Sequence, residues 1–357
     1  MTRTLLPGLP GLPGLPGLPG AVAAAAVLAS LGLASAAFGA DYTLRIQTHH
    51  SPETLPGKIF LQFVQDVEAN SGGQIDIEEF MSSSVVKSVE TFDAASTGIL
   101  DGDMTGAAYQ TGKDPAFQFL GDVMGGYDDP MQMHGWLNEG GGREIADELY
   151  ANYNMHLVGF WGQVPESLSS TKPLAGPDDL KNWKFRSPPG METEIFERLG
   201  ASPIVMDFGE VFTALTTGIV DGADYAALNT NRSVGLYDIA KHATYPGWHS
   251  MPSDHLAINL DKWNELPPDL QQVITDALEK AAQDIAEQSL VENEQAAKEL
   301  TAEGITLHDW SDEDVKAYRE FAQGVWLEWA EKSPLAKQAV DSHIAYMKKT
   351  GLLGDGS

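Results

Sequence analysis

Arg186 is the residue whose type and position most favour a role in binding an anion. It follows the apolar residues Trp183 and Phe185 of an expected strand and precedes a turn at Ser187-Pro188-Pro189-Gly190. A guanidinium group offers two parallel donors whose spacing matches a carboxylate. The alternative is an arginine in a structural ion pair, and the surroundings of the side chain must decide between the two.

Other polar and aromatic side chains suit a small ligand. The hydroxyl of Tyr109 can donate to a carboxylate or an oxo group, although the ring could also be part of the core. Glu166, near Gln163, can coordinate a cation, accept from a cationic ligand group or face solvent. Trp248 and His249 can form a small apolar wall.

Signals of catalysis are poor. The nine histidines lack metal-ligand spacing such as His-Glu-x-x-His, and there is no Gly-x-Ser-x-Gly elbow. Gly140-Gly141-Gly142 is followed by no Lys-Ser or Lys-Thr pair, so we interpret it as a turn before a helix. These patterns predict a binding protein and not an enzyme, with a secreted two-lobed enzyme as the alternative from another class.

The charge limits the partners. The chain has 357 residues, a formal net charge of -29 and no cysteine. Such an acidic surface argues against nucleic acid and anionic lipid, and disulfides cannot contribute. An anion-binding pocket in this chain must supply its own local positive charge.

The first 39 residues predict a cleaved signal peptide. Arg3 is the only charged residue before Asp41, and five Leu-Pro-Gly triplets lead into the apolar stretch Ala21 to Ala37. A positive start, a short apolar core and small residues at the end are typical of a secretory leader. Cleavage is expected after Gly39 or Ala40, which predicts a periplasmic protein; a membrane anchor is the alternative.

The elements that must position these residues alternate between strand and helix. Residues 42–47 alternate as a strand, 52–70 have a helical apolar face, and 74–80 alternate again. Further helices are expected at 178–180, 192–199, 270–302 and 312–349. This β-α-β rhythm predicts an α/β protein with helices packed on a sheet.

An internal repeat predicts two similar lobes. Residues 92–102 and 212–222 share seven of eleven residue types, 120 positions apart. Each copy reads as a helix that ends at a glycine, Gly98 or Gly218, followed by an Asp-Gly turn into a buried strand. These strands are expected at 104–109 and 223–228, one in each half of the chain.

Several motifs together resemble the periplasmic binding proteins of tripartite ATP-independent periplasmic (TRAP) transporters. They are the helix-turn-strand unit 212–224, the segment from Lys172-Pro173 to Lys184-Phe185-Arg186, and Trp263-Asn-Glu-Leu-Pro-Pro-Asp-Leu270. The resemblance implies a two-lobed, type II-like fold with hinge strands and long C-terminal helices. The expected division is a signal peptide at 1–39, a first lobe at 40–163 plus 252–291, and a second lobe with the C-terminal helices at 164–251 plus 292–357. It also implies a membrane permease as partner.

A narrower resemblance is to the branch that binds 2-oxo acids and lactate. It rests on residues 107–109, 113–119, 136–142 and 245–249. By this resemblance Arg186 pairs with the substrate carboxylate with help from Tyr109, and Asp224 and Tyr225 hold a bridging Na⁺ or Ca²⁺ with Gln163 or Glu166. The implied substrate is a small 2-oxo or 2-hydroxy monocarboxylate.

Two departures from that branch keep other ligands open. Residues 226–231 lack its Gly-Pro segment, and Ser250 stands where an acidic residue is usual. A uronate or other sugar acid, a dicarboxylate or an ectoine-like zwitterion are therefore alternative ligands. The branch also suggests a homodimer through C-terminal residues such as Phe321 and Trp326, which could equally pack onto their own lobe.

Overall fold

The computed structural model describes residues 40–353. The predicted signal peptide at 1–39 lies outside the described residues. Within 40–353, none of the helices combines the length and the apolar character needed to cross a bilayer.

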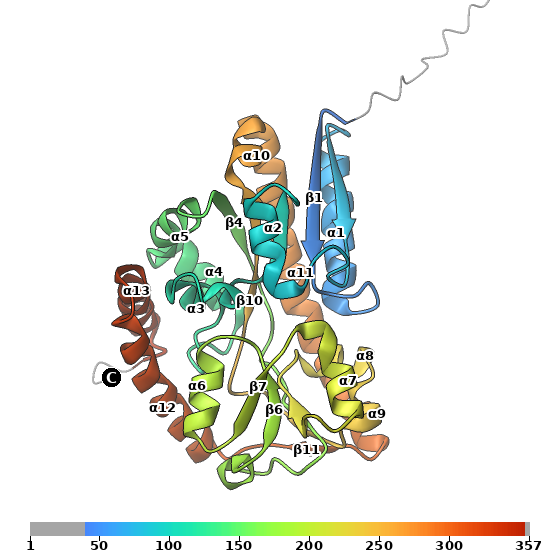
Figure 1. Ribbon diagram of the computed structural model, residues 1–357, viewed down its shortest axis with the longest axis vertical. Coiled ribbons are helices and arrows are strands. Elements are labelled where there is room, and N and C mark those ends of the chain that lie inside the picture. Colours follow the sequence, from blue (N-terminus) through green and yellow to red (C-terminus); the bar gives the residue numbers. More distant parts are fainter. Residues whose placement is uncertain (1–39, 354–357) are drawn as a thin grey trace, which may run out of the picture. The chain divides into compact units, whose positions relative to one another are not determined.

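The first lobe is built on a five-stranded sheet (Figure 1). Its strand order is β2-β1-β3-β10-β4, and β10 runs antiparallel to both of its neighbours. The bounds are β1 (Tyr42–Thr48), β2 (Ile75–Phe80), β3 (Gly102–Gly106), β4 (Met155–Gly162) and β10 (Ser253–Asn259).

The second lobe is built on a six-stranded sheet in the order β11-β9-β5-β8-β6-β7. The bounds are β5 (Ser169–Ser170), β6 (Lys184–Ser187), β7 (Ser202–Val205), β8 (Gly222–Ala223), β9 (His242–Thr244) and β11 (Thr306–His308). In each sheet, three neighbouring strands run parallel and the fourth runs antiparallel to them. The parallel strands are β2-β1-β3, followed by β10, in the first sheet and β7-β6-β8, followed by β5, in the second.

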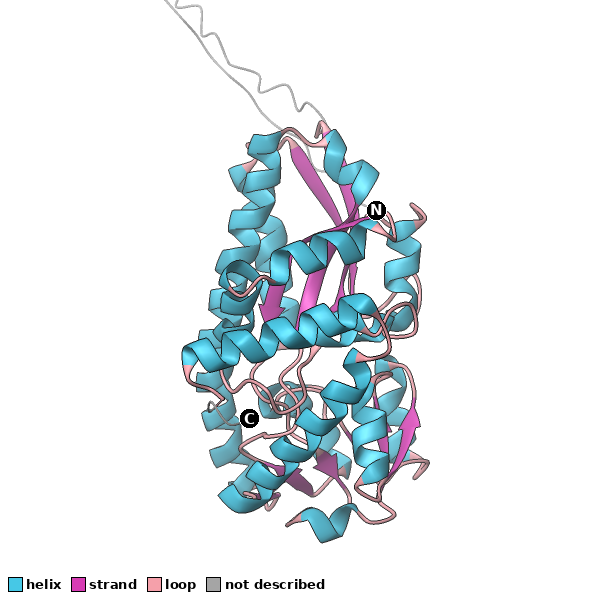
Figure 2. Ribbon diagram, turned by 90° about the vertical axis from the view of Figure 1, so that its left-hand side faces the viewer, coloured by secondary structure: helices cyan, strands magenta, loops and turns pink. Residues whose placement is uncertain are grey.

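Helices flank the strands in both lobes (Figure 2). Their bounds are α1 (Leu55–Asn70), α2 (Thr91–Ser96), α3 (Ala116–Gly121), α4 (Pro130–Glu139), α5 (Gly142–Ala151), α6 (Met191–Arg198), α7 (Val211–Thr216), α8 (Leu228–Ser233), α9 (Leu236–Ile239), α10 (Leu260–Glu265), α11 (Pro268–Ala302), α12 (Asp312–Ala330) and α13 (Pro334–Thr350). The 3₁₀ helices among the described residues are η1 (Ser88–Glu90), η2 (Ala107–Gln110), η3 (Pro177–Leu180) and η4 (Phe208–Glu210).

The two copies of the repeat occupy equivalent places in the two sheets, which confirms the predicted pair of lobes. Gly98 and Gly218 end α2 and α7 with φ of 82° and 71°, a conformation that glycine adopts without strain. Asp101 then accepts from the backbone N–H of Arg45, and Asp221 accepts from that of Lys184. Each aspartate thus fixes the start of its strand beside the neighbouring parallel strand.

The first sheet is buried on both faces. One face packs against α1 and α11, with Phe60, Phe63 and Ile274 among the buried residues. The other face packs against helices α2 to α5, with Phe117 and Leu149 among its contacts. Because helices cover both faces, every residue of β3 and β10 is buried.

Two chain segments cross between the sheets side by side. Gln163 follows β4 and donates its backbone N–H to Pro252, and Glu166 donates to Ser250 in the segment that leads to β10. A Cβ at Gly247 would lie 2.1 Å from the Glu166 carbonyl oxygen, so only glycine allows this approach. These paired segments connect the two lobes, although they are not regular strands. Helix α11 also contacts both lobes, at α1 and β4 in the first and at α8 and β11 in the second.

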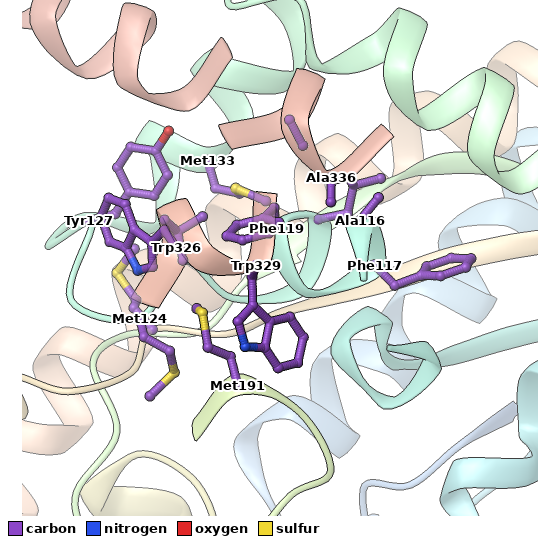
Figure 3. Close-up of a cluster of buried hydrophobic side chains, with 14 of the residues drawn as sticks. Ala116, Phe117, Phe119, Met124, Tyr127, Met133, Met191, Trp326, Trp329 and Ala336 are labelled. Atoms are coloured by element: carbon purple, nitrogen blue, oxygen red, sulfur yellow. The ribbon is translucent and has the colours of Figure 1, made fainter. Parts of the chain in front are cut away.

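The C-terminal helices pack onto their own chain. Pro334 begins α13 and splits the expected helix 312–349 into α12 and α13. Trp326 and Trp329 of α12 are buried with Phe119 and Met191 in one cluster (Figure 3). The predicted boundaries group α13 with the second lobe; α13 packs against α12 and also contacts α3 and α5 of the first lobe.

The strands after the repeats are shorter than expected. β3 ends at Gly106, and Tyr109 lies in the 3₁₀ helix η2. β8 contains two residues, and the chain then leaves the sheet before α8. The side chains predicted at strand ends are therefore held by the segments that follow the strands.

Candidate ligand-binding site

A cavity of about 60 Å³ lies between the two lobes, beside the hinge segments. The first lobe lines it with residues that follow β1, β3 and α3, and the second lobe lines it with residues that follow β6, β7 and β8. A water molecule needs roughly 10–15 Å³ of such volume. The cavity therefore has room for a small ligand of a few heavy atoms in this conformation.

Arg186 lines the cavity and is 2 % exposed. Its Nε donates to the Met206 carbonyl at 3.2 Å and its Nη1 to the Asp224 carbonyl at 2.7 Å. Within residues 40–353 the guanidinium makes no salt bridge. Because a buried charge is costly unless it is paired, this group is suited to an anion that enters the cavity.

Three aromatic rings surround the guanidinium. It lies over the ring of Phe208, 5.9 Å from the centroid, and Phe208 stacks on Tyr225 at 3.9 Å. Tyr109 lines the cavity from the other lobe; burial raises the pKa of its hydroxyl, and the nearby Arg186 opposes that rise. Tyr109 thus stays a neutral donor beside the cation.

Four carboxyl groups gather on one side of the cavity, and they cannot all be ionised. The Ser250 hydroxyl lies 2.7 Å from an oxygen of Asp122 and 2.7 Å from an oxygen of Glu166. One hydroxyl has one hydrogen to donate. The other contact therefore requires a protonated carboxyl group.

The pKa shifts divide the acidic groups into neutral and ionised members. Burial, and then the Asp224 charge, raise the pKa values of Glu166 and Glu192 well above the usual range. Burial also raises the pKa of Asp122 to about 7. Burial alone would raise the pKa of Asp224 as well, but its contact with His249 at 3.2 Å, its Glu192 hydrogen bond and the Arg186 charge hold it below the usual range.

This donor set fits a hard cation. Ligand atoms of Glu166, Asp224 and His249 lie within 4.8 Å of one another, and all three residues are buried. Hard cations prefer oxygen ligands, and here two carboxylates would supply them. Glu192 has a buried oxygen without a partner among the described residues. A cation would take the place of the protons that these groups now require.

The structure gathers most of the predicted site residues and leaves one outside. Arg186, Tyr109, Glu166, Asp224 and Tyr225 all line the cavity.

Gln163 lines the cavity too, but its side chain donates to Asp254 at 3.2 Å and not to Asp224. Trp248 does not line it: the indole stacks on Trp310 at 4.1 Å and packs against Tyr318 in the core.

Several residues that face the cavity were not predicted from the sequence. They are Asp122, Glu192, Asp254 and the adjacent histidines His49 and His50. The histidine pair directly after a strand was a visible signal. The sequence carries no local signal for Asp122 or Glu192. Each lies at the end of a helix, and only the tertiary fold places these helix ends beside the cavity.

Contacts between repeat-related segments hold the lobes together beside the cavity. Asp207 of the second lobe accepts from the backbone N–H of Ser88 at 3.0 Å and from its hydroxyl at 2.6 Å. Lys87 pairs with Glu210 at 3.3 Å. Gln118 of α3 accepts from the backbone N–H of Met191 at 2.7 Å. Each of these bonds joins a residue of the first lobe to a residue of the second.

Residues 46–333 match the family model of bacterial extracellular solute-binding proteins, family 7. The chain belongs to this family. It is 29 % identical over 283 residues to a monocarboxylate 2-oxoacid-binding periplasmic protein of Nostoc. The matched region covers 78 % of this chain and 77 % of the relative.

Solved structures of TRAP periplasmic solute-binding proteins share the fold. One from Rhodobacter sphaeroides, in an open state without ligand, is 33 % identical with a TM-score of 0.69, covering 88 % of this chain and all of that one. One from Pseudoalteromonas atlantica, with bound sodium and pyruvate, is 25 % identical with a TM-score of 0.77, covering 87 % and 95 %. Proteins of this family bind small organic acids and work with a membrane permease.

Proposed function

We propose that this protein captures a 2-oxo or 2-hydroxy monocarboxylate in the periplasm and delivers it to a TRAP permease. The observation that carries the proposal is Arg186, a buried cation that faces the cavity without a salt bridge in the described residues. A carboxylate would complete its coordination with two parallel hydrogen bonds. Tyr109 would donate to the same ligand.

Asp224 and Glu166 would hold Na⁺ or Ca²⁺ in the same cavity, with Tyr225 beside them. The cation would neutralise their charge and coordinate the oxo or hydroxyl oxygen of the ligand. In support, the structure from Pseudoalteromonas atlantica contains sodium with pyruvate. Glu166 and Glu192 would give up their protons when the cation binds.

The size of the cavity supports a short acid. At about 60 Å³ it offers the space of a few water molecules. A six-carbon uronate would have to displace side chains or keep the lobes further apart. A short ligand can bridge Arg186 of one lobe and Tyr109 of the other while the contacts of Asp207 with Ser88 stay formed.

Ligand binding would then shift the protein toward the closed state. Arg186 and Asp224 come from the second lobe and Tyr109 from the first, so all of them contact one ligand only after closure. A ligand that binds one state more tightly moves the equilibrium toward that state. The permease would recognise the closed surface.

A thermal-shift screen after removal of metals with EDTA tests this function. The ligands are pyruvate, lactate, longer 2-oxo acids, C4-dicarboxylates, uronates and ectoine, each with and without Na⁺ or Ca²⁺. A ligand that binds only the folded state raises the melting temperature. We expect the largest shift from a short 2-oxo or 2-hydroxy acid with a cation. A shift by a uronate alone, independent of cation, would contradict both the substrate and the cation.

A further inference from the structure

A second group of potential metal ligands lines the first-lobe side of the cavity. It consists of His49 and His50, which directly follow β1, and Asp254, the second residue of β10. All three line the cavity, and they are 7 %, 3 % and 3 % exposed. Strand β3 lies between β1 and β10, so the sheet itself fixes the separation of the two sides of this group.

The three ligand atoms have the spacing of a metal site. His49 Nε2 lies 3.1 Å from His50 Nε2, His50 Nε2 lies 2.8 Å from Asp254 Oδ2, and His49 Nε2 lies 3.7 Å from the same oxygen. Ligands at 2.0–2.1 Å from a tetrahedral Zn²⁺ stand about 3.3 Å apart. The observed separations lie on both sides of that value.

Hydrogen bonds alone do not satisfy this arrangement. His50 Nε2 takes part in two short contacts, yet an imidazole nitrogen carries either one hydrogen or one lone pair. If it donates to Asp254, the lone pair of His49 Nε2 has no donor. Buried polar atoms are nearly always partnered, and one ion bound by both Nε2 atoms and by Asp254 Oδ2 would give each of these atoms a partner.

Neighbouring residues hold the carboxylate in place. Trp161 Nε1 donates to Asp254 Oδ2 at 2.9 Å, and Gln163 Nε2 donates to the same atom at 3.2 Å. The His49 ring stacks on Phe208 of the other lobe at 4.6 Å. Such outer contacts are what orients the ligands of a metal site.

We propose that His49, His50 and Asp254 bind a divalent first-row transition-metal ion such as Zn²⁺, with its open coordination positions toward the ligand cavity. Two imidazole nitrogens with one carboxylate favour such an ion over Na⁺ or Ca²⁺, which prefer all-oxygen sites. The cavity therefore has two cation sites of different preference. An acid held by Arg186 would reach the metal across the cavity; that last step rests on the proposed function, whereas metal binding itself does not.

Zn²⁺ titration of the EDTA-treated protein, in competition with a chromogenic chelator, tests the site. The wild type is expected to bind one Zn²⁺ tightly. His50→Gln and His49→Gln are expected to lower the affinity by more than about 100-fold. The matched control is His242→Gln, because His242 lies 3.0 Å from His308 in a histidine pair outside the cavity; this variant is expected to keep the tight site.

A second measurement uses only the wild type, so it still tests the site if the variants do not fold. Co²⁺ added to the wild type should give the visible absorption of a nitrogen-coordinated, low-symmetry ion, and Zn²⁺ should abolish it. The proposal is overturned if the wild type binds no Zn²⁺, or if folded His50→Gln binds it as tightly as the wild type. Arg186→Gln should keep Zn²⁺ and lose the acid. If it keeps both, the proposed function fails while the metal site stands.

Discussion

Gln47 and Arg186 occupy equivalent positions in the two lobes and differ in charge. Asp101 contacts Arg45 and Asp221 contacts Lys184 in the same way, so the residues two places further along β1 and β6 correspond. Gln47 donates to the Val86 carbonyl, and Arg186 donates to the carbonyl of Met206, 120 residues later. Gln47 therefore joins β1 to the segment after the neighbouring strand β2, and Arg186 joins β6 to the segment after the neighbouring strand β7.

The difference shows what the fold requires and what it does not. Gln47 accepts from the backbone N–H groups of Val85 and Val86 and also donates to Thr91, so a neutral side chain meets the structural need completely. Arg186 adds a buried charge that the structural role does not call for. We propose that an anionic ligand pairs with this charge.

The largest expected effect comes from making the second lobe resemble the first. Arg186→Gln should lower the affinity for the acid by roughly 100-fold, about 3 kcal/mol, because the buried carboxylate loses its charged partner. The melting temperature should change little, since glutamine fills the equivalent position in β1. Calorimetric titration and thermal unfolding measure the two effects. Arg198→Gln, an exposed arginine on α6, is the control; equal losses in both variants would contradict the assignment.

A substitution at the equivalent position of the first lobe, Gln47, should lower stability and leave acid binding unchanged. Gln47→Ala leaves the backbone groups of Val85 and Val86 without partners, which should cost about 2 kcal/mol of unfolding free energy. Acid affinity should stay within about twofold of the wild type. Urea unfolding and titration measure this. A large loss of acid affinity in a folded Gln47→Ala protein would remove the distinction between the two positions.

Asp224→Asn tests the cation on the second-lobe wall. Removal of one charged ligand should reduce the Ca²⁺-dependent gain in acid affinity by about tenfold, roughly 1.4 kcal/mol. Titrations with and without Ca²⁺ measure the change. Asp221→Asn, at the start of the same strand but outside the cavity, is the control. An unchanged Ca²⁺ response in Asp224→Asn would mean that the cation is held elsewhere.

Asp207→Ala should weaken closure without touching the ligand. Its carboxylate holds the N–H and hydroxyl of Ser88 in the other lobe. Loss of these bonds should cost about 1 kcal/mol of closure energy, which appears as a roughly fivefold weaker acid affinity. Small-angle scattering should show a larger open fraction without ligand. Glu210→Gln, which removes an exposed ion pair with Lys87, should have almost no effect.

The smallest effect is a pH dependence of stability. The carboxyl group of Asp122 has a pKa of about 7 in the folded protein, so between pH 6.5 and about pH 8 it holds a proton that the same group in the unfolded chain has already lost. The contribution of Asp122 to the stability of the metal-free protein should therefore fall by about 1 kcal/mol as pH rises through this range. Ca²⁺ should reduce the fall because it replaces the protons. Asp122→Asn should flatten the profile, and a metal-free protein that gains stability with pH would contradict this scheme.

The sequence was sufficient for features that one local segment determines. The repeat of residues 92–102 and 212–222 correctly predicted paired helix-turn-strand units, because the glycine and the Asp-Gly turn act locally. Arg186 was also predicted from the sequence as a cavity residue, because it lies near the end of a strand.

The histidine–aspartate group could not be predicted in the same way. Asp254 lies 204 residues after His50, and the two meet only because β10 joins the first sheet antiparallel to β3. One face of that sheet packs against α1 and α11, which lie far apart along the chain. Trp248 shows the reverse case, since its neighbour His249 faces Asp224 while the indole enters the core.

A crystal structure with the tightest-binding acid from the ligand screen tests the central claim most directly. We predict that the ligand carboxylate accepts two hydrogen bonds from the Arg186 guanidinium, with the hydroxyl of Tyr109 in contact. A carboxylate bound elsewhere in the cavity, with Arg186 still bonded only to the carbonyls of Met206 and Asp224, would contradict it.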